Sequence, residues 1–409
     1  MISFCITLKV NDIILIMKKR IGLLTFIALV LGCFCGIILK EKCAQIAFLG
    51  TWYISLLKMM ITPVIFTSIA YTVYKTSKRE DKLILKAIAL FMVMFTVTFI
   101  ISSVIIFLID PARGFVMEDV AWEGNTAEFS LGGMLLNLLP KSLNDVFINP
   151  KVFFVIVFSF LFGKIGSLFD ADGLFEGINE VKDFLFRIME VIMYLTPVAT
   201  FALMANTVYK YGAVLLGVGL KYILTAYLCA LVCLIVVMML PVRLFAGISL
   251  KEYVSKVYKI WIMTVSTCSS AATLPFTVRL CKEEFGISDK TAGVVVPLGC
   301  TIHMCGGAVS FALLGIFCLK IYGIDLNIYT YILMIVASLL INMAAPGIPN
   351  GGVVVGATYL QIFGVPLGFI GFYSGIYKLL DMCYTTLNVT GDISASILIE
   401  KNEKEEKKS

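Results

Sequence analysis

Charged residues are scarce in this chain, and histidine is nearly absent. Asp, Glu, Lys and Arg make up 15% of the 409 residues, against about 25% in a typical soluble protein. The single histidine, His303, has no evident catalytic partner, and the sequence contains no P-loop. The sequence therefore indicates neither a hydrolytic enzyme nor an ATP-driven machine, and we expect no enzymatic activity and no organic cofactor.

The cysteine pattern lacks the signatures of metal and disulfide sites. The twelve cysteines include no Cys-x-x-Cys pair, so neither a zinc site nor a disulfide framework is indicated. Most of them lie in apolar stretches, where packing is their ordinary role. The net charge of +6 comes from basic residues in short loops between apolar segments, so we expect no nucleic-acid partner.

Apolar sequence is what the chain has in excess. Hydrophobic residues make up 60% of it, and the mean hydropathy is +0.97. Three uncharged segments, Ile21–Leu39, Ala87–Ile109 and Tyr222–Leu240, are each long enough to cross a bilayer, which takes about 20 helical residues. The composition predicts an all-α integral membrane protein surrounded by lipid.

The N-terminal segment looks like a signal peptide without a cleavage site. Met17–Arg20 is basic and precedes the first apolar segment. That segment is longer than a usual signal-peptide core and ends without small residues, so we expect a first membrane helix that stays in place. Residues 1–16 would form an N-terminal extension, and the alternative is that translation begins at Met17.

The loop charges predict one orientation. The basic segments Met17–Arg20, Lys75–Lys86 and Arg243–Lys259 lie inside by the positive-inside rule, and the acidic loop Asp110–Phe129 lies outside. The tail over residues 402–409 is then cytoplasmic. We expect a multi-pass protein of the plasma membrane with both termini in the cytoplasm.

Two segments do not fit simple membrane spans. Trp261–Pro275 is interrupted by hydroxyl side chains, small residues and a proline, and Ile328–Tyr377 is uncharged but far too long for one span. Ala344–Gly352, rich in Pro and Gly, interrupts the second. We interpret both as re-entrant helical hairpins, which point to a transporter's binding site. The alternatives are a serine-rich membrane helix for the first and two ordinary helices for the second.

A row of polar side chains follows the second hairpin. Asp381, Thr385, Asn388 and Asp392 share one helical face at about 100° per residue. A carboxylate at bilayer depth costs at least a few kcal/mol unless it is paired, protonated or facing water. This face is therefore predicted to bind something.

Four motifs occur in an order that resembles the dicarboxylate/amino-acid:cation symporters, the family of the excitatory amino-acid transporters and their archaeal glutamate-transporter homologue. They are Ser269–Pro275, Pro297–Met304, Gly347–Gly352 and Asp381–Asp392. Leu57–Phe66 also resembles the family's second-helix signature. The resemblance covers nearly the whole chain.

The resemblance implies eight transmembrane helices plus two re-entrant hairpins, built from inverted repeats and assembled as a homotrimer. It implies a symporter domain over residues 17–401. The scaffold would comprise about residues 17–75 and 130–206, and the transport unit about residues 85–110 and 215–400. The transport unit would carry the site across the membrane like an elevator.

The resemblance also assigns the substrate contacts. Asp381 matches the aspartate that holds the substrate's ammonium group, and charge-assisted hydrogen bonds suit that role. The other matched positions are Ser270 for the α-carboxylate, Ile348 and Gly352 as backbone contacts, and Thr385 and Asn388 as polar contacts. A packing role for Thr385 is the alternative.

Sodium ligands follow from the same motifs. Asp392, the Asn388 side chain and the Gly299 carbonyl match one sodium site, and Thr301 and Met304 lie near a second. The alternative for Asp392 is a structural carboxylate near the helix end.

The chain departs from the family at the positions that set specificity. Acidic-substrate members have an arginine where this chain has Tyr384, and some have a first-hairpin arginine where it has Cys268. No guanidinium remains to pair with a second substrate carboxylate. We therefore expect a neutral amino acid, with Tyr384 contacting its side chain. The alternative is that Lys378 supplies the missing cation; it could instead be the ion-pair partner of Asp381.

The seventh-helix signature is changed more drastically. The family asparagine is replaced by His303 and its sodium-ligating aspartate by Cys305, and apolar side chains, among them Phe91, replace the polar third-helix partners. This predicts the loss of a third sodium site. Three roles for His303 stay open: a neutral packing residue, a proton carrier, and a direct cation ligand.

The sequence thus predicts secondary-active symport of a small neutral amino acid with sodium, using fewer ions than typical members, with a proton as a further candidate ion. The first alternative is a symporter of acidic amino acids or dicarboxylates. The second is a non-transporting receptor or uncoupled pore on the same fold.

Overall fold

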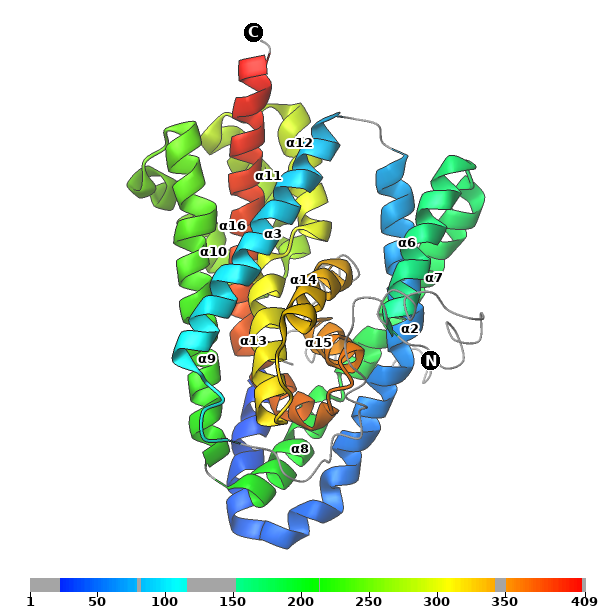
Figure 1. Ribbon diagram of the computed structural model, residues 1–409, viewed down its shortest axis with the longest axis vertical. Coiled ribbons are helices and arrows are strands. Elements are labelled where there is room, and N and C mark those ends of the chain that lie inside the picture. Colours follow the sequence, from blue (N-terminus) through cyan, green and yellow to red (C-terminus); the bar gives the residue numbers. More distant parts are fainter. Residues whose placement is uncertain (1–22, 79–81, 116–151, 213, 343–350, 407–409) are drawn as a thin grey trace, which may run out of the picture.

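The computed structural model describes residues 23–78, 82–115, 152–212, 214–342 and 351–406. All regular structure within these ranges is helical, as the composition predicts. The helices form two groups that lie side by side along the long axis of the molecule (Figure 1).

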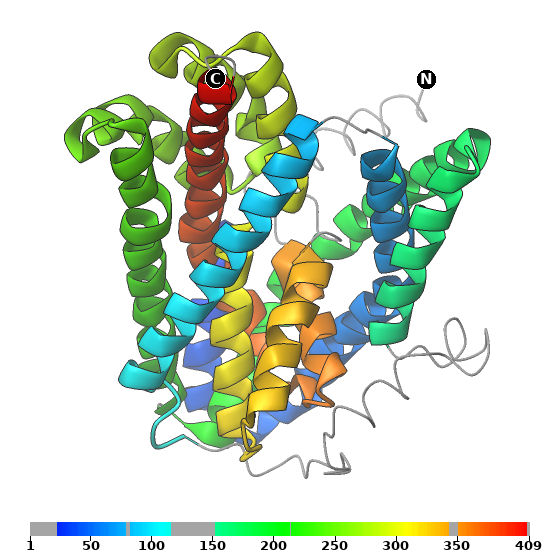
Figure 2. The ribbon, with the colours of Figure 1, turned by 45° about the horizontal axis from the view of Figure 1, so that its top comes forward.

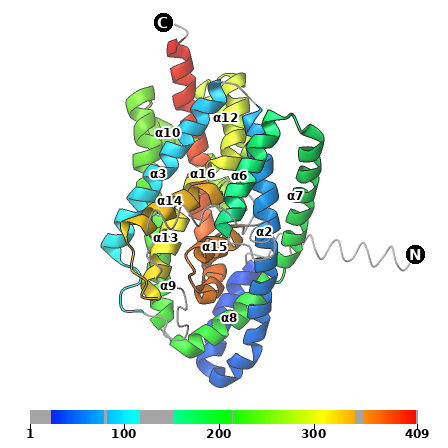
Figure 3. The same cartoon turned by 45° about the vertical axis from the view of Figure 1, so that its right-hand side comes forward.

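The first group surrounds one long helix. Helix α2 (Ala47–Ser77) packs on α6 (Val152–Leu168), α7 (Asp172–Met193) and α8 (Thr196–Tyr211). Residues 23–39 are also helical and lead through the short η1 (Lys40–Ile46) into α2. Helices α2, α6 and α7 form one side of the molecule (Figure 3). Gly163 lets α6 approach the Ala70 carbonyl of α2 closely, because a Cβ there would overlap that oxygen.

The second group contains the C-terminal half together with α3, and Figure 2 shows several of its helices around α16. In chain order its elements are α3 (Lys82–Ile109), α9 (Val214–Cys233), η2 (Leu234–Met239), η3 (Val242–Ala246), α10 (Leu250–Thr267), α11 (Ser270–Phe285), α12 (Asp289–Ile302), α13 (Cys305–Ile321), α14 (Ile328–Asn342), α15 (Gly351–Ile362), η4 (Leu367–Phe369) and α16 (Ile370–Glu406).

The long apolar helices confirm the predicted membrane segments. Leu23–Tyr53, Lys82–Ile109 and Gly217–Ala246 are long and apolar enough to cross a bilayer, and they contain most or all of the three uncharged segments. Asp289–Ile321 also qualifies, although it is interrupted between α12 and α13. Of the residues in its most apolar stretch, 94% are buried, so this stretch lies at the centre of its group.

Both predicted interruptions occur. Helix α10 ends at Thr267, Cys268 adopts a left-handed conformation with φ of 49°, and α11 begins at Ser270. The side chain of Ser269 caps α11 by accepting a hydrogen bond from the Ala272 N–H at 3.2 Å. The two helices pack on each other, as the arms of a hairpin do.

The second uncharged stretch is divided into short helices. Helices α14 and α15 have 15 and 12 residues and pack on each other. At 1.5 Å per residue they span about 22 and 18 Å, less than the roughly 30 Å of bilayer hydrocarbon. Most of the Gly347–Gly352 motif, Ile348 included, lies outside the described residues.

Candidate functional site

A helix break at the centre of the second group organises the site. Helix α12 ends at Ile302, and His303 has extended backbone and Met304 a non-helical conformation before α13 begins at Cys305. The Gly299 carbonyl accepts the His303 N–H at 2.8 Å, which closes the last turn of α12. Helix ends leave backbone carbonyls and N–H groups without partners inside the helix, so the break places polar backbone in a buried position.

The first turn of α13 holds the asparagine of the predicted polar face. The Asn388 side-chain oxygen accepts the Gly306 N–H at 2.7 Å. Glycine is required there, because a Cβ on Gly306 would overlap the backbone carbonyl of Tyr384. A Cβ on Gly307 would likewise overlap the side-chain oxygen of Asn342, at the end of α14. Asn342 is a buried residue of this site that the sequence motifs did not identify.

A buried chain of three side chains, here called the Asp392 chain, crosses the break. His303 Nδ1 lies 2.9 Å from Asp392 Oδ1, and Cys305 Sγ lies 3.0 Å from His303 Nε2. Phe91 of α3 stacks on the imidazole, with ring centroids 4.5 Å apart. The side chains of His303 and Asp392 are 0% and 2% exposed. Both imidazole nitrogens therefore contact protein groups, which favours a hydrogen-bonding role for His303 over direct cation ligation.

Two glycines make room for the Asp392 chain. A Cβ on Gly299 would overlap the Asp392 carboxylate, and a Cβ on Gly391 would overlap the His303 ring. The predicted sodium ligands Gly299 and Asp392 are thus in close contact. Within the described ranges no group of three or more His, Cys, Asp and Glu residues is arranged to hold a metal ion.

The two other predicted sodium-site residues lie in different surroundings. Met304 is buried at the break itself, immediately before α13. Thr301 has an exposed side chain whose hydroxyl donates to the Leu298 carbonyl at 2.8 Å. It lines a separate cavity of about 590 Å³ between α2 and α7 on one side and α11 and α12 on the other. The structure does not bring the Thr301 side chain into the Asp392 chain.

The other end of the polar face lies near the tip of the first hairpin. Asp381 is buried at 7% exposure, and Thr385 donates to its carboxylate at 3.1 Å. The Lys378 ammonium and the Asp381 carboxylate both lie close enough to the thiol of Cys268 to act on it by their charges. Ser270 is buried in the first turn of α11. A carboxylate, an ammonium group and a helix N-terminus therefore meet here.

Tyr384 lies on the aromatic side of α16. Its side chain is 2% exposed, and it belongs to the buried hydrophobic cluster that includes Tyr222 and Tyr373. Its hydroxyl is buried and has no hydrogen-bond partner among the described residues. This position favours packing for Tyr384, and its contact with substrate stays a prediction.

Hydrogen bonds fix α10 to α16 around these residues. Trp261 donates to the Thr390 hydroxyl at 2.9 Å, and the hydroxyls of Thr264 and Thr386 lie 2.7 Å apart. Gly352, at the start of α15, is close to the Tyr377 hydroxyl of α16. Both interrupted segments therefore pack against the helix that carries the polar face.

Comparison with known proteins gives a consistent result over nearly the whole chain. The model of the sodium:dicarboxylate symporter family matches residues 21–402. C4-dicarboxylate transport protein 1 of Ralstonia nicotianae is 26% identical over 391 residues, which cover 92% of this chain and 91% of that protein. The C4-dicarboxylate transport protein of Anaeromyxobacter sp. strain K is 27% identical over 404 residues, covering 95% and 91%.

Proposed function

Because the chain belongs to the sodium:dicarboxylate symporter family, we propose that this multi-pass membrane protein couples the movement of a small dicarboxylate or acidic amino acid to cations. The relatives' names favour this class of substrate over the neutral amino acid that the sequence alone led us to expect. The loss of the family arginine argued for a neutral substrate, and it left Lys378 as the replacement cation.

The position of Lys378 carries the proposal. It lies on α16 one turn before Asp381, near Cys268, the first-hairpin residue that stands where some members have an arginine. Asp381 lies nearby and suits an ammonium group of the substrate. A four-carbon dicarboxylate that also carries an ammonium group would satisfy both, with its distal carboxylate on Lys378. Lysine is a compact charge without the bidentate fork of arginine, so recognition of that carboxylate would be less directional.

Tyr384 favours a second candidate, the neutral amino acid. A phenol replaces the guanidinium, and it lies in the same buried hydrophobic cluster as Tyr222 and Tyr373. If Lys378 instead neutralises Asp381 between transport cycles, no cation is left for a second carboxylate.

Competition for uptake at fixed sodium separates the two candidates. In proteoliposomes, strong aspartate or succinate uptake with weak serine and alanine uptake supports the acidic substrate, and the reverse result supports the neutral one. Lys378→Met should abolish the acidic preference, whereas Lys256→Met, which removes a half-buried lysine paired with Glu252 on α10, should leave it unchanged. Binding without concentrative uptake would indicate a receptor or an uncoupled pore.

For the coupling ions, we propose sodium at the oxygen ligands of Asp392, Asn388 and Gly299. The contacts of His303 support fewer sodium ions than in typical members, because Phe91 and Cys305 surround the imidazole where a third sodium site would need oxygen ligands. His303 could exchange a proton with Asp392, which makes a proton the candidate second ion.

For the architecture, we propose eight transmembrane helices, two re-entrant hairpins and a homotrimer in the plasma membrane, with both termini cytoplasmic. The short lengths of α14 and α15 support the second hairpin. The contacts of α2 with α6, α7 and α8 support a scaffold, and those of α16 with α10, α11, α12 and α13 support a transport unit. The predicted elevator motion would carry the second group along the first.

A further inference from the structure

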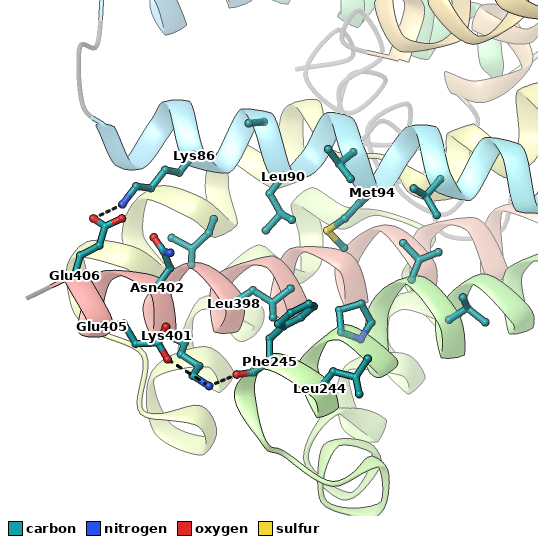
Figure 4. Close-up of a pocket in the computed structure, with 17 residues that line it drawn as sticks. Lys86, Leu90, Met94, Leu244, Phe245, Leu398, Lys401, Asn402, Glu405 and Glu406 are labelled. Atoms are coloured by element: carbon teal, nitrogen blue, oxygen red, sulfur yellow. Dashed lines mark hydrogen bonds and ion pairs between the residues drawn. The ribbon is translucent and has the colours of Figure 1, made fainter. Parts of the chain in front are cut away.

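A cleft on the outer wall of the second group has no role in the proposed symport. It lies at the end of the molecule that carries the C-terminus, between α3, the segment η2–η3 and α16 (Figure 4). Its volume is about 930 Å³, within the roughly 300–1,000 Å³ typical of small-molecule sites. We infer that this cleft binds one phospholipid whose headgroup carries both a phosphate and a primary ammonium group.

The walls of the cleft are apolar and accessible from the surrounding lipid. Val93 and Val97 of α3 are 59% and 39% exposed, and Leu244 of η3 is 67% exposed. Both Lys82–Ile109 and Gly217–Ala246 are long and apolar enough to span a bilayer. An acyl chain is the apolar ligand that reaches such a wall without crossing water.

An irregular helix forms one wall. The segments η2 and η3 are π-helical and flank Leu240–Pro241. Proline has no N–H to donate, so it disturbs the regular helical pattern at this point. π-Helical turns are rare and are found frequently at functional sites. The wall therefore departs from ordinary helix geometry where a ligand would lie.

The rim of the cleft carries charges of both signs. Lys86 Nζ lies 2.7 Å from Glu406 and 2.6 Å from Glu403, and Lys401 Nζ lies 3.5 Å from Glu405. Lys401 also donates to the Phe245 carbonyl. The rim side chains Lys86, Lys401, Glu405 and Glu406 are 30%, 44%, 64% and 58% exposed. Such exposed ion pairs are weak, so a headgroup can exchange with them.

A zwitterionic headgroup matches this rim better than an anionic one. The phosphate of the headgroup would form ion pairs with the ammonium groups of Lys86 and Lys401. The ammonium group of the headgroup would form ion pairs with the carboxylates of Glu405 and Glu406. A quaternary ammonium group prefers an aromatic cage, but Phe245 is the one aromatic residue of the described lining. The hydrogen-bond acceptors of the rim therefore favour a primary amine, as in phosphatidylethanolamine.

Lipid retention tests the inference on the full-length protein. The purified protein is exchanged into an equimolar mixture of phosphatidylethanolamine, phosphatidylcholine and phosphatidylglycerol, and the lipids that remain bound are counted by native mass spectrometry. We expect one phosphatidylethanolamine per chain, retained several-fold over the other two lipids. Equal retention of all three, or preferential retention of phosphatidylglycerol, would overturn the proposed headgroup.

A matched pair of variants places the lipid. Val93→Trp fills the cleft and should reduce retention several-fold. Val104→Trp makes the same change at a residue of α3 that is 53% exposed and does not line the cleft, and it should retain the lipid. Equal losses in the two variants would exclude the cleft. Lys401→Gln, a milder surface change, should weaken the preference for phosphatidylethanolamine even if Val93→Trp fails to fold.

Discussion

At the scale of single residues, Asp381 is a buried carboxylate with a clear chemical role. Its carboxylate is 7% exposed and accepts a hydrogen bond from Thr385 at 3.1 Å. Asp381→Asn keeps the shape but removes the charge. A hydrogen bond to a charged group contributes about 1.5–3 kcal/mol, so we expect substrate affinity to fall about 10- to 100-fold. Isothermal titration with substrate measures the loss. Asp289→Asn, at an exposed acid paired with Lys282, should bind normally; equal losses would contradict the role of Asp381.

His303 is the residue whose substitution best separates the candidate coupling ions. Its ring bridges Asp392 and Cys305, and histidine is the side chain that ordinarily titrates between about pH 5 and 8. If it carries a proton, His303→Ala should flatten the pH dependence of uptake, whereas Asp392→Asn should remove the sodium dependence. Uptake measured over a grid of pH and sodium concentration checks both. Unchanged pH and sodium profiles in His303→Ala would rule out the proton carrier.

Local contacts of the site could be predicted from the sequence, whereas contacts between residues far apart in the chain could not. Asp381 and Thr385 lie one helical turn apart, so helix periodicity predicted that they share one face, and in the structure they form a hydrogen bond. The surroundings of Tyr384 include Tyr222, on a helix more than 150 positions earlier. No local pattern predicts such a neighbour. The stacking of Phe91 on His303 was not predicted either. The changed motifs associated both residues with the same lost sodium site, but they did not predict that the two rings stack.

At the scale of elements, hydropathy predicted the long spans but not the break between α12 and α13. A hydropathy window measures only how long an apolar segment is. Asp289–Ile321 has a mean hydropathy of 2.0 in such a window, although its helix is interrupted. The non-helical backbone of His303 and Met304 depends on tertiary partners, chiefly Asn388 and Asp392 of α16. The π-helical wall of the lipid cleft was missed for the same reason.

The close approach of α13 to α16 predicts a stability effect. Alanine in place of a helical glycine ordinarily stabilises by up to about 1 kcal/mol. At Gly306 the added Cβ would overlap the Tyr384 backbone, and such overpacking costs about 1–3 kcal/mol. Gly306→Ala should therefore lower the thermal unfolding temperature. Gly293→Ala in α12 meets nothing within 4 Å and should leave it unchanged or raise it, so equal shifts would contradict the packing argument.

The end of α2 and the start of α7 are joined by a pH-dependent contact. Lys78 Nζ lies 2.6 Å from Asp172, and the Tyr74 hydroxyl donates to the same carboxylate at 2.5 Å. The Lys78 ammonium, and then the Tyr74 hydroxyl, lower the pKa of the Asp172 carboxyl. The folded state then binds fewer protons than the unfolded state, so this stabilisation is present above the ordinary carboxyl pKa of about 3.9 and is lost as the pH falls below it.

Asp172→Asn should accordingly lower the unfolding temperature slightly at pH 7, because the group is exposed, and the difference from wild type should shrink in acid. Unfolding followed by fluorescence at several pH values checks this. Glu176→Gln, at an exposed acid one turn further along α7, serves as the control. A difference for Asp172→Asn that grows towards low pH would contradict the sign of the argument.

At the scale of the whole molecule, the cavity between the two helix groups offers a test of the proposed motion. Lys75 of α2 and Thr301 of α12 line it from opposite sides. In an elevator, α12 moves with the transport unit while α2 stays in the scaffold. A thiol at residue 301 should therefore change its reactivity towards an impermeant reagent when substrate and sodium are added, whereas a thiol at residue 75 should not.

The native cysteines are poorly accessible to a thiol reagent, which makes this labelling experiment practicable. Those in the described residues are buried, except for Cys35 and Cys383, which are half-buried, so background labelling should be low. Thr301→Cys and Lys75→Cys are labelled from the cytoplasmic side with and without substrate, and the rates are compared within each variant. We expect a several-fold change for Thr301→Cys alone. Parallel changes in both variants would indicate a local opening of the cavity, and unchanged rates in both would mean that α12 does not move relative to α2.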